Sequence, residues 1–211
     1  MMNPRLRTTT AVAAMVGGAI LAVHSLAHWA LYGSPFDLVE VAQKPDWILL
    51  NVLLLAGMIL LLLGLVGLHE RQAQRAGVFG LIAFLVLFVG FALRTGLVVA
   101  EVFLVPSVAR QAPDVLTVEE PPLEFGLFFL VEMATKIGGL LLFGIATIRA
   151  RVFPVAAGYV LVGGIVVSAI PGLVFLGVAI GGSTLAWMGW HHLVTTRSAH
   201  DAPAPMPASS G

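Results

Sequence analysis

The stretch 77–101, GVFGLIAFLVLFVGFALRTGLVVAE, decides the fold of this chain. It is apolar over the length of about 20 residues that a helix needs to cross a hydrocarbon core of about 30 Å. It nevertheless contains Arg94 and ends at Glu101. A charge in hydrocarbon costs roughly 2.5 kcal/mol or more, so such residues persist only when they are paired, solvated or close to the interface. The stretch therefore predicts a transmembrane helix that makes a specific polar contact.

The composition of the whole chain is typical of a multi-pass membrane protein. Its 211 residues are 59% hydrophobic and 10% charged, whereas a soluble domain carries about 25% charged residues. The net charge is zero, so nothing indicates a nucleic-acid partner. The absence of cysteine excludes disulfides, thiolate metal sites and cysteine nucleophiles. The sequence has no phosphate loop, nucleophile elbow or catalytic triad, which argues against an enzyme.

Six apolar stretches predict an all-α fold, a bundle of six transmembrane helices. The predicted spans are about 10–31, 47–68, 77–101, 123–148, 154–170 and 172–195. The last two are separated by Pro171-Gly172, because proline disfavours helix at the residue before it and lacks a backbone donor. One kinked, re-entrant hairpin over 154–195 is the alternative. We expect a single transmembrane domain, 1–197, followed by a disordered tail, 198–211, rich in Ala, Pro and Ser.

The distribution of basic residues predicts the orientation of the spans. Six spans place seven arginines on one side, namely Arg5, Arg7, Arg71, Arg75, Arg149, Arg151 and Arg197. The other side holds Lys44 and Arg110. Both termini are therefore expected in the cytoplasm, with the protein in the cytoplasmic membrane. A cleaved signal peptide is the less favoured interpretation of the first span, because His24, His28 and Trp29 stand where a small-residue cleavage site is needed.

The polar residues of the spans are predicted to meet in the outer half of the membrane. At 1.5 Å per residue, His24 lies about 21 Å and Arg94 about 26 Å above the inner ends of their helices. Glu132 lies about 14 Å and Lys136 about 20 Å below the outer end of theirs. We expect a ligand or ion pocket, open to the outside, formed by residues of four helices: His24, His28, Asn51, Arg94, Glu101, Glu132 and Lys136.

Sequence spacing puts these residues in three pairs, each on one helical face. Glu132 precedes Lys136 by four residues, the favoured order for a helical ion pair. Arg94 and Glu101 are seven apart, and seven residues make two turns. The alternative interpretation is static: ion pairs that fix helix register, with Arg94 and Glu101 reaching the interface.

His24 and His28 form the third pair and are the main candidates for a metal or haem site, ahead of His191-His192. Two histidines four residues apart can bind a metal from one helical face. The segment His24-Ser25-Leu26-Ala27-His28 lacks the glutamate of an H-E-x-x-H motif. We therefore predict no cofactor and favour hydrogen bonding of both rings to neighbouring helices, with haem or metal as the alternative.

Other features of the sequence have structural interpretations. Gly177-x-x-x-Gly181, with Gly138, Gly139, Gly163 and Gly164, is typical of close helix packing. His191-His192 follows Trp187 and Trp190 and is typical of an interfacial aromatic belt. The loop 33–46 has the pattern of a short interfacial amphipathic helix, and 111–122 that of a plain loop.

The segment Gly64-Leu65-Val66-Gly67-Leu68-His69-Glu70-Arg71-Gln72-Ala73 is followed by Gly77 and a long apolar helix. It resembles a pattern in uncharacterised multi-pass bacterial membrane proteins, in which the next helix ends with an acid and a proline, like Glu101 and Pro106 here. The resemblance implies a helical bacterial membrane protein and no particular chemistry.

Three functions follow as expectations. The outer pocket binds or transports a small molecule, proton or ion; or the chain is an accessory subunit whose charges meet another membrane protein; or His24 and His28 serve a metal or haem redox centre. The lipid bilayer is the partner common to all three.

Overall fold

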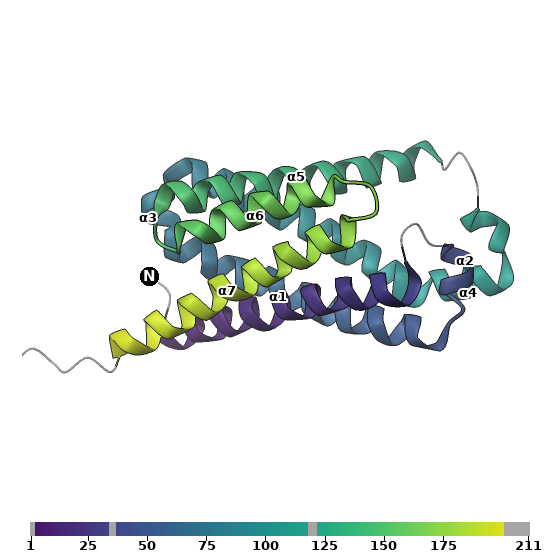
Figure 1. Ribbon diagram of the computed structural model, residues 1–211, viewed down its shortest axis with the longest axis horizontal. Helices are drawn as coiled ribbons and strands as arrows, with labels where there is room; N and C mark the ends of the chain where they lie inside the picture. Colours follow the sequence, from purple (N-terminus) through teal and green to yellow (C-terminus); the bar gives the residue numbers. More distant parts are fainter. Residues whose placement is uncertain (1–2, 34–36, 118–121, 201–211) are drawn as a thin grey trace, which may run out of the picture.

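The computed structural model describes residues 3–33, 37–117 and 122–200. Every regular element in these ranges is helical (Figure 1). In chain order they are α1 (Pro4–Tyr32), α2 (Leu38–Val41), α3 (Pro45–Phe103), α4 (Val105–Gln111), the 3₁₀ helix η1 (Pro113–Leu116), α5 (Leu123–Ala150), α6 (Val155–Ser168) and α7 (Val174–His200).

Helices of membrane-spanning length and apolarity identify the general class of the fold. Within the described residues, three helices are long and apolar enough to cross a bilayer: α1 over Arg5–Tyr32, α3 and α5. Large apolar side chains cover the outside of the bundle; Leu49 is 72% and Leu130 61% exposed. A soluble protein rarely exposes so continuous an apolar surface to water. These features indicate a membrane protein.

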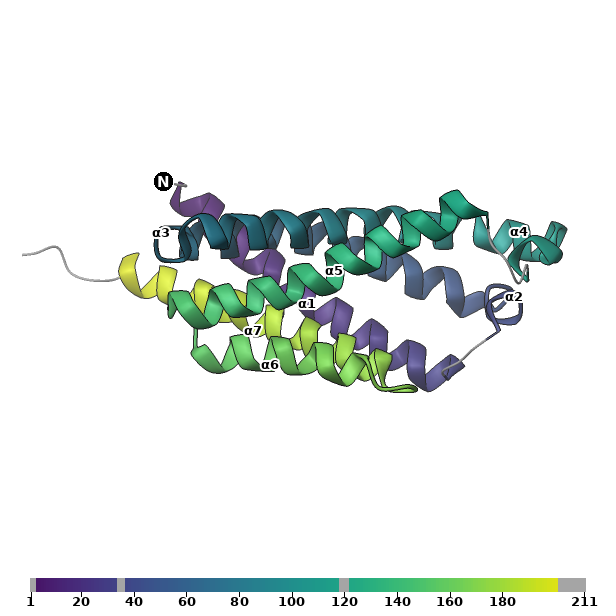
Figure 2. The same ribbon diagram turned by 90° about the horizontal axis from the view of Figure 1, so that it is seen from above.

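Helix α3 is a hairpin of two antiparallel arms, 45–76 and 78–103. Gly77, with φ 57° and ψ −151°, interrupts its helical backbone, in a region open essentially to glycine alone. The rings of His69 and Phe84 stack 4.4 Å apart across this bend. At the far end, the Trp47 Nε1–H donates to the Glu101 carbonyl over 3.0 Å, although the two residues are 54 positions apart. Figure 2 shows α3 turning back at the end of the bundle where α1 begins.

The remaining helices pack in a chain of neighbours around α1 and α3. Helix α1 lies between α3 and α7, while α5 lies between α3 and α6, and α6 also contacts α7. One apolar core connects them, with Leu61 and Leu87 on α3, Phe143 on α5, Leu161 on α6 and Leu185 on α7. Every one of these side chains is almost fully buried.

Glycines allow several of these helix pairs to approach closely. A Cβ added at Gly139 would collide with the backbone of Leu87 on α3, and one at Gly177 with α6 near Gly164. The packing role predicted for these three glycines is thus confirmed. Gly138, Gly163 and Gly181 instead face open space. Helix α7 instead approaches the backbone of α1 at Gly182, next to the predicted Gly181, and at Gly189.

The predicted apolar stretches lie largely within helices, with differences at their ends. The second stretch, expected to end at residue 68, continues as helix to the bend at Gly77. The predicted break at Pro171-Gly172 falls between α6 and α7, where Gly172 has φ +81°. At 14 residues, α6 is about 21 Å long, which is shorter than the hydrocarbon core.

Three predictions fall partly outside the described residues. Helix α2 forms within the loop 33–46, but residues 34–36 are not described. Helix α4 ends at Gln111 and η1 lies within the loop 111–122, of which 118–121 are not described. Of the predicted disordered tail, residues 201–211 lie outside the described part.

The arginine-containing segments at the start of α1, at the bend of α3 and at the end of α5 lie at the same end of the bundle (Figure 2). There Arg7 of α1 pairs with Glu70 of α3, Nη2 to Oε1 at 2.9 Å. The Arg149 guanidinium lies over the Phe79 ring at 5.2 Å, joining the end of α5 to the bend of α3. We call this end of the bundle the basic end. Helices α2 and α4 lie at the opposite end (Figure 1).

Candidate functional site

The ion pair of Glu132 and Lys136 is the most deeply buried charged feature of the predicted site. Lys136 Nζ lies 2.6 Å from Glu132 Oε1 on the same face of α5. The Glu132 side chain is fully buried, whereas that of Lys136 is 28% exposed. The second carboxylate oxygen, Oε2, is buried and has no hydrogen-bond partner within the described part of the chain. Glu132 thus holds one satisfied and one unsatisfied acceptor.

Close approach of two backbones positions this pair. A Cβ added at Gly90, on the second arm of α3, would collide with the backbone of Thr135 and Lys136. Gly139, one turn further along α5, meets the backbone of Leu87 in the same way. Small residues at such crossings let helices touch without side chains between them. The crossing therefore holds the backbone of Lys136 directly against the second arm of α3.

Arg94 and Glu101 form a two-pronged pair on the second arm of α3. Nη1 lies 2.9 Å from Oε1 and Nη2 3.2 Å from Oε2. Their side chains are 27% and 23% exposed. Two parallel N–H···O bonds fix the guanidinium plane as well as its distance. The seven-residue spacing therefore does bring these charges together.

His24 and His28 are buried on α1, each 5% exposed. Their ring centroids lie 5.8 Å apart. The His28 ring stacks on Phe175 of α7 at 4.5 Å and meets the edge of Trp47 at 5.9 Å. His24 Nε2 is buried without a hydrogen-bond partner among the described residues. Aromatic packing therefore holds His28, while His24 retains an unsatisfied nitrogen.

Asn51 is hydrogen-bonded to the backbone near the site and has a structural role. It is 2% exposed, and its side-chain amide donates to the Trp47 carbonyl over 3.0 Å. Trp47 in turn donates to the Glu101 carbonyl. Through Trp47, Asn51 is connected to the two arms of α3 and to the His28 ring.

Arg94 lies near the other two polar pairs of the site. Its guanidinium is close enough to act electrostatically on both imidazoles of α1. It also acts on the Lys136 ammonium, as does the Glu101 carboxylate. His24 and His28 of α1, Arg94 and Glu101 near the end of the second arm of α3, and Glu132 and Lys136 of α5 thus lie in one region of the bundle, which we call the charged cluster.

The metal alternative depends on further ligands near His24 and His28. Among the residues that the structure describes, no three His, Asp or Glu side chains gather in a way that holds a metal ion. A metal or haem centre stays the alternative to the prediction of no cofactor, and an optical spectrum and metal analysis of the purified protein test it directly.

The first third of α5 is exposed on all sides. Every residue from 122 to 131 is exposed, including Leu123 at 73% and Phe125 at 53%. Glu132 is the first buried residue after this segment. An apolar helix that is exposed all round requires lipid or another protein as its neighbour. The charged cluster therefore lies beside an unpacked flank of the bundle.

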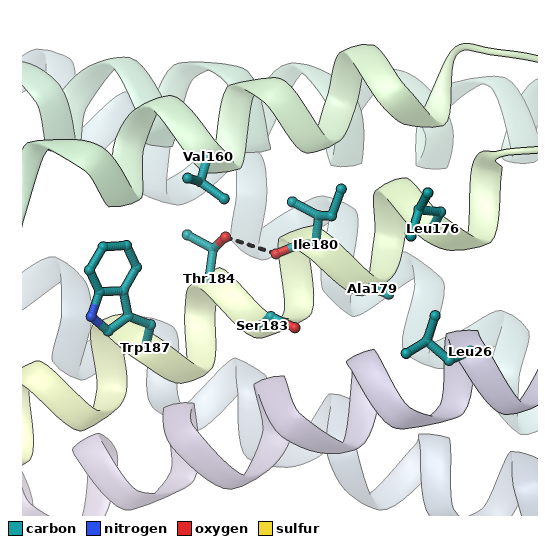
Figure 3. A pocket seen from close by; sticks show the side chains of 8 residues that line it. All are labelled: Leu26, Val160, Leu176, Ala179, Ile180, Ser183, Thr184 and Trp187. Atoms are coloured by element: carbon teal, nitrogen blue, oxygen red, sulfur yellow. Dashed lines mark hydrogen bonds between the residues drawn. The ribbon is translucent and has the colours of Figure 1, made fainter.

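A separate apolar pocket lies on the flank where α1, α6 and α7 meet (Figure 3). Its volume is about 340 Å³. It is lined by Leu26 of α1, Val160 of α6 and Trp187 of α7. The hydroxyl of Thr184, which also lines the pocket, donates a hydrogen bond to the Ile180 carbonyl over 2.8 Å. No residue of the charged cluster lines this pocket.

Sequence reasoning missed a polar group at the basic end. His192 of α7, predicted to belong to an interfacial belt, is 1% exposed, and its Nδ1 lies 3.0 Å from Arg71 Nη1 of α3. Nearby, Thr147 of α5 donates to the side chain of Gln72, over 3.2 Å, and both are fully buried. Arg71 and His192 are 121 positions apart, and Gln72 and Thr147 are 75 apart. No local sequence pattern therefore predicts these contacts.

Comparison of the chain with models of known protein families, with curated proteins and with solved structures found no match. The resemblance around Gly64–Ala73 therefore stays an expectation from the sequence, and the functional argument rests on the geometry of this chain.

Proposed function

We propose that this chain is an integral protein of the cytoplasmic membrane whose charged cluster binds a proton, a cation or a small molecule that donates hydrogen bonds. The binding group is Glu132. Its electrostatic environment is set by Lys136, Arg94 and Glu101. His24 belongs to the same charged cluster. Access is from the outer side, along the unpacked first third of α5.

One observation carries the proposal: Glu132 is fully buried and its Oε2 accepts no hydrogen bond from the described residues. An unsatisfied buried acceptor is costly, more so for a charged group. Ionisable groups in membrane helices are rare and mark pathways for protons, ions or substrates. A proton, a cation or an N–H or O–H donor would satisfy this oxygen, whereas an anion would be repelled by it.

The arrangement of the helices in the membrane belongs to the same proposal. With the two arms of α3 counted separately, six helical segments cross the bilayer and both termini lie in the cytoplasm. The gathering of arginines at the basic end supports this orientation, because cytoplasmic loops are enriched in Lys and Arg. The charged cluster then lies in the outer half.

A thermal-shift screen of purified protein in detergent tests the proposal. The wild type, Glu132→Gln and Glu124→Gln are compared over a pH series and with Na⁺, K⁺, ammonium and primary amines. Glu124 is exposed at the start of the same helix, so its variant is the matched control. A ligand that binds the native state raises its melting temperature. We expect a stabiliser that acts on wild type and Glu124→Gln and not on Glu132→Gln.

The opposite result would remove the proposal. If pH and every cation shift Glu132→Gln and Glu124→Gln equally, Glu132 is not a binding group, and the buried pair only fixes helix register.

A role as an accessory subunit is the second candidate, favoured by the exposed segment 122–131 of α5. Another transmembrane helix packed there would cover its apolar surface and reach the quarter-exposed Arg94 and Glu101. Photo-crosslinking from position Phe129 in native membranes tests this role. Crosslinks to one protein species support it, whereas crosslinks to lipid alone contradict it.

A further inference from the structure

The basic end contains a second polar pocket, which the proposed function does not use. Its volume is about 160 Å³. Five side chains from three helices line it: Arg7 of α1, Glu70, Arg71 and Gln74 of α3, and His192 of α7. Most of its lining is polar, in contrast to the apolar pocket on the flank.

The protonation of His192 follows from its contact with Arg71. Arginine nitrogens only donate hydrogen bonds. Arg71 Nη1, 3.0 Å from His192 Nδ1, must therefore donate to it. Nδ1 is then the unprotonated ring nitrogen, and the proton of the neutral ring resides on Nε2. His192 thus presents Nε2 as a hydrogen-bond donor.

Donors around this pocket lack acceptors. His192 Nε2, Arg7 Nε and Arg71 Nε are all buried without a hydrogen-bond partner among the described residues. The Glu70 carboxylate, 2.9 Å from Arg7 Nη2, compensates one of the two guanidinium charges. The residues that line the pocket therefore carry one excess positive charge and three buried N–H groups without a partner among the described residues. An oxyanion supplies both missing elements, negative charge and several acceptors.

The size and the position of the pocket indicate which class of anion it can bind. A water molecule takes about 30 Å³ in the liquid, so the pocket holds roughly the volume of five waters, enough for one tetrahedral oxyanion group. It lies at the basic end of the bundle, which the proposed orientation, on which this step rests, places at the level of the cytoplasmic lipid headgroups. Basic pockets between membrane helices on the cytoplasmic side bind anionic headgroups.

We infer that the pocket formed by Arg7, Arg71 and His192 binds the phosphoryl group of an anionic phospholipid headgroup or of free phosphate. Arg71 and His192 act as one unit, in which Arg71 fixes the imidazole so that Nε2–H is available as a donor. Glu70 holds Arg7 in place and sets the net charge of the site. None of the residues that line this pocket belongs to the charged cluster.

Melting temperatures of the full-length protein in detergent test the inference. The probes are dioctanoyl phosphatidylglycerol, dioctanoyl phosphatidylcholine with the same chains, and inorganic phosphate compared with chloride at equal ionic strength. The variants are Arg71→Gln, His192→Leu and, as control, Arg75→Gln. Arg75 is an exposed arginine of the same turn, so its variant loses the same charge without touching the pocket.

Phosphatidylglycerol is expected to stabilise the wild type and Arg75→Gln, with an apparent affinity roughly tenfold lower in Arg71→Gln. His192→Leu removes the Nε2 donor at constant charge and should weaken binding as well; it also serves if Arg71→Gln does not fold. Stabilisation by inorganic phosphate with the same dependence on the variants identifies a free anion as the ligand, and stabilisation by phosphatidylglycerol alone a headgroup. Equal shifts with both lipids and with both salts, or an equal loss in Arg75→Gln, would overturn the inference.

Discussion

Lys136 Nζ lies 2.6 Å from Oε1 of Glu132, one helical turn earlier on α5, and the Glu132 side chain is fully buried. Lys136 retains 28% exposure, so the pair joins a buried carboxylate to an ammonium at the edge of the packed region. Removing one member of such a pair leaves the other charge uncompensated, whereas removing both leaves no uncompensated charge.

Glu132→Gln is therefore expected to lower the free energy of unfolding by about 3 kcal/mol, the lower end for a broken buried pair because Lys136 is partly exposed. The double variant Glu132→Gln/Lys136→Met should recover most of this loss. Unfolding by SDS in mixed micelles, followed by circular dichroism, measures both. A double variant as unstable as the single one would show that the pair does not couple these residues.

Arg94→Lys should cost about 1 kcal/mol, because an ammonium cannot reproduce the two parallel bonds to Glu101. The control is Lys44→Gln. Lys44 pairs with Glu40 at 3.0 Å, but the two side chains are 38% and 69% exposed, so we expect a loss of no more than about 0.5 kcal/mol. The same unfolding measurement applies, and equal losses in the two variants would contradict the structural role of the Arg94–Glu101 pair.

Gly139→Ala and Gly138→Ala make the sharpest test of helix packing, because they put the same methyl group on neighbouring positions. At Gly139 the methyl meets the Leu87 backbone, and at Gly138 it meets open space. Overpacking predicts a loss of about 1–3 kcal/mol for Gly139→Ala. Gly138→Ala should stay within about 1 kcal/mol of wild type, on the stabilising side, because alanine favours helix. Reversed effects would contradict the register of α5 on α3.

Gly77→Ala should destabilise the hairpin of α3 by about 1–3 kcal/mol, since Gly77 has φ 57° and ψ −151°, a conformation that side chains rarely adopt. No atom lies within 4 Å of the added methyl, so the loss arises from backbone strain alone. Gly96→Ala, also in open space but within regular helix, is the control. If both variants unfold at the wild-type SDS concentration, the bend does not depend on glycine.

The natural absence of cysteine allows the membrane orientation to be read from single introduced thiols. Arg75→Cys lies at the basic end, and Asp114→Cys lies in η1 beside α4 at the opposite end. A membrane-impermeant maleimide added to intact cells should label Asp114→Cys, and label Arg75→Cys only after the membrane is opened. The reverse labelling pattern would invert the proposed orientation and place the charged cluster on the inner side.

Local chemistry made much of the fold predictable. Apolar length locates the helices, Pro171-Gly172 marks the turn before α7, and i, i+4 or i, i+7 spacing fixes which charges on one helix can pair. The Glu132–Lys136 and Arg94–Glu101 pairs follow from that spacing. A turn between the second and third apolar stretches was likewise expected, but the structure places it later, at Gly77, because the helix continues beyond residue 68.

Contacts between helices could not be derived in the same way, because hydropathy does not encode which faces meet. The sequence by itself determined an apolar, helical, membrane-type chain with pairs of charges at fixed intervals. Only the tertiary structure decided that Gly139 packs and Gly138 does not, that Glu132 is enclosed while the helix before it is exposed, and that His192 meets Arg71 from the other end of the chain. The physical reason is that helix periodicity is set within a few residues, whereas burial and the pairing of distant polar groups depend on how whole helices cross.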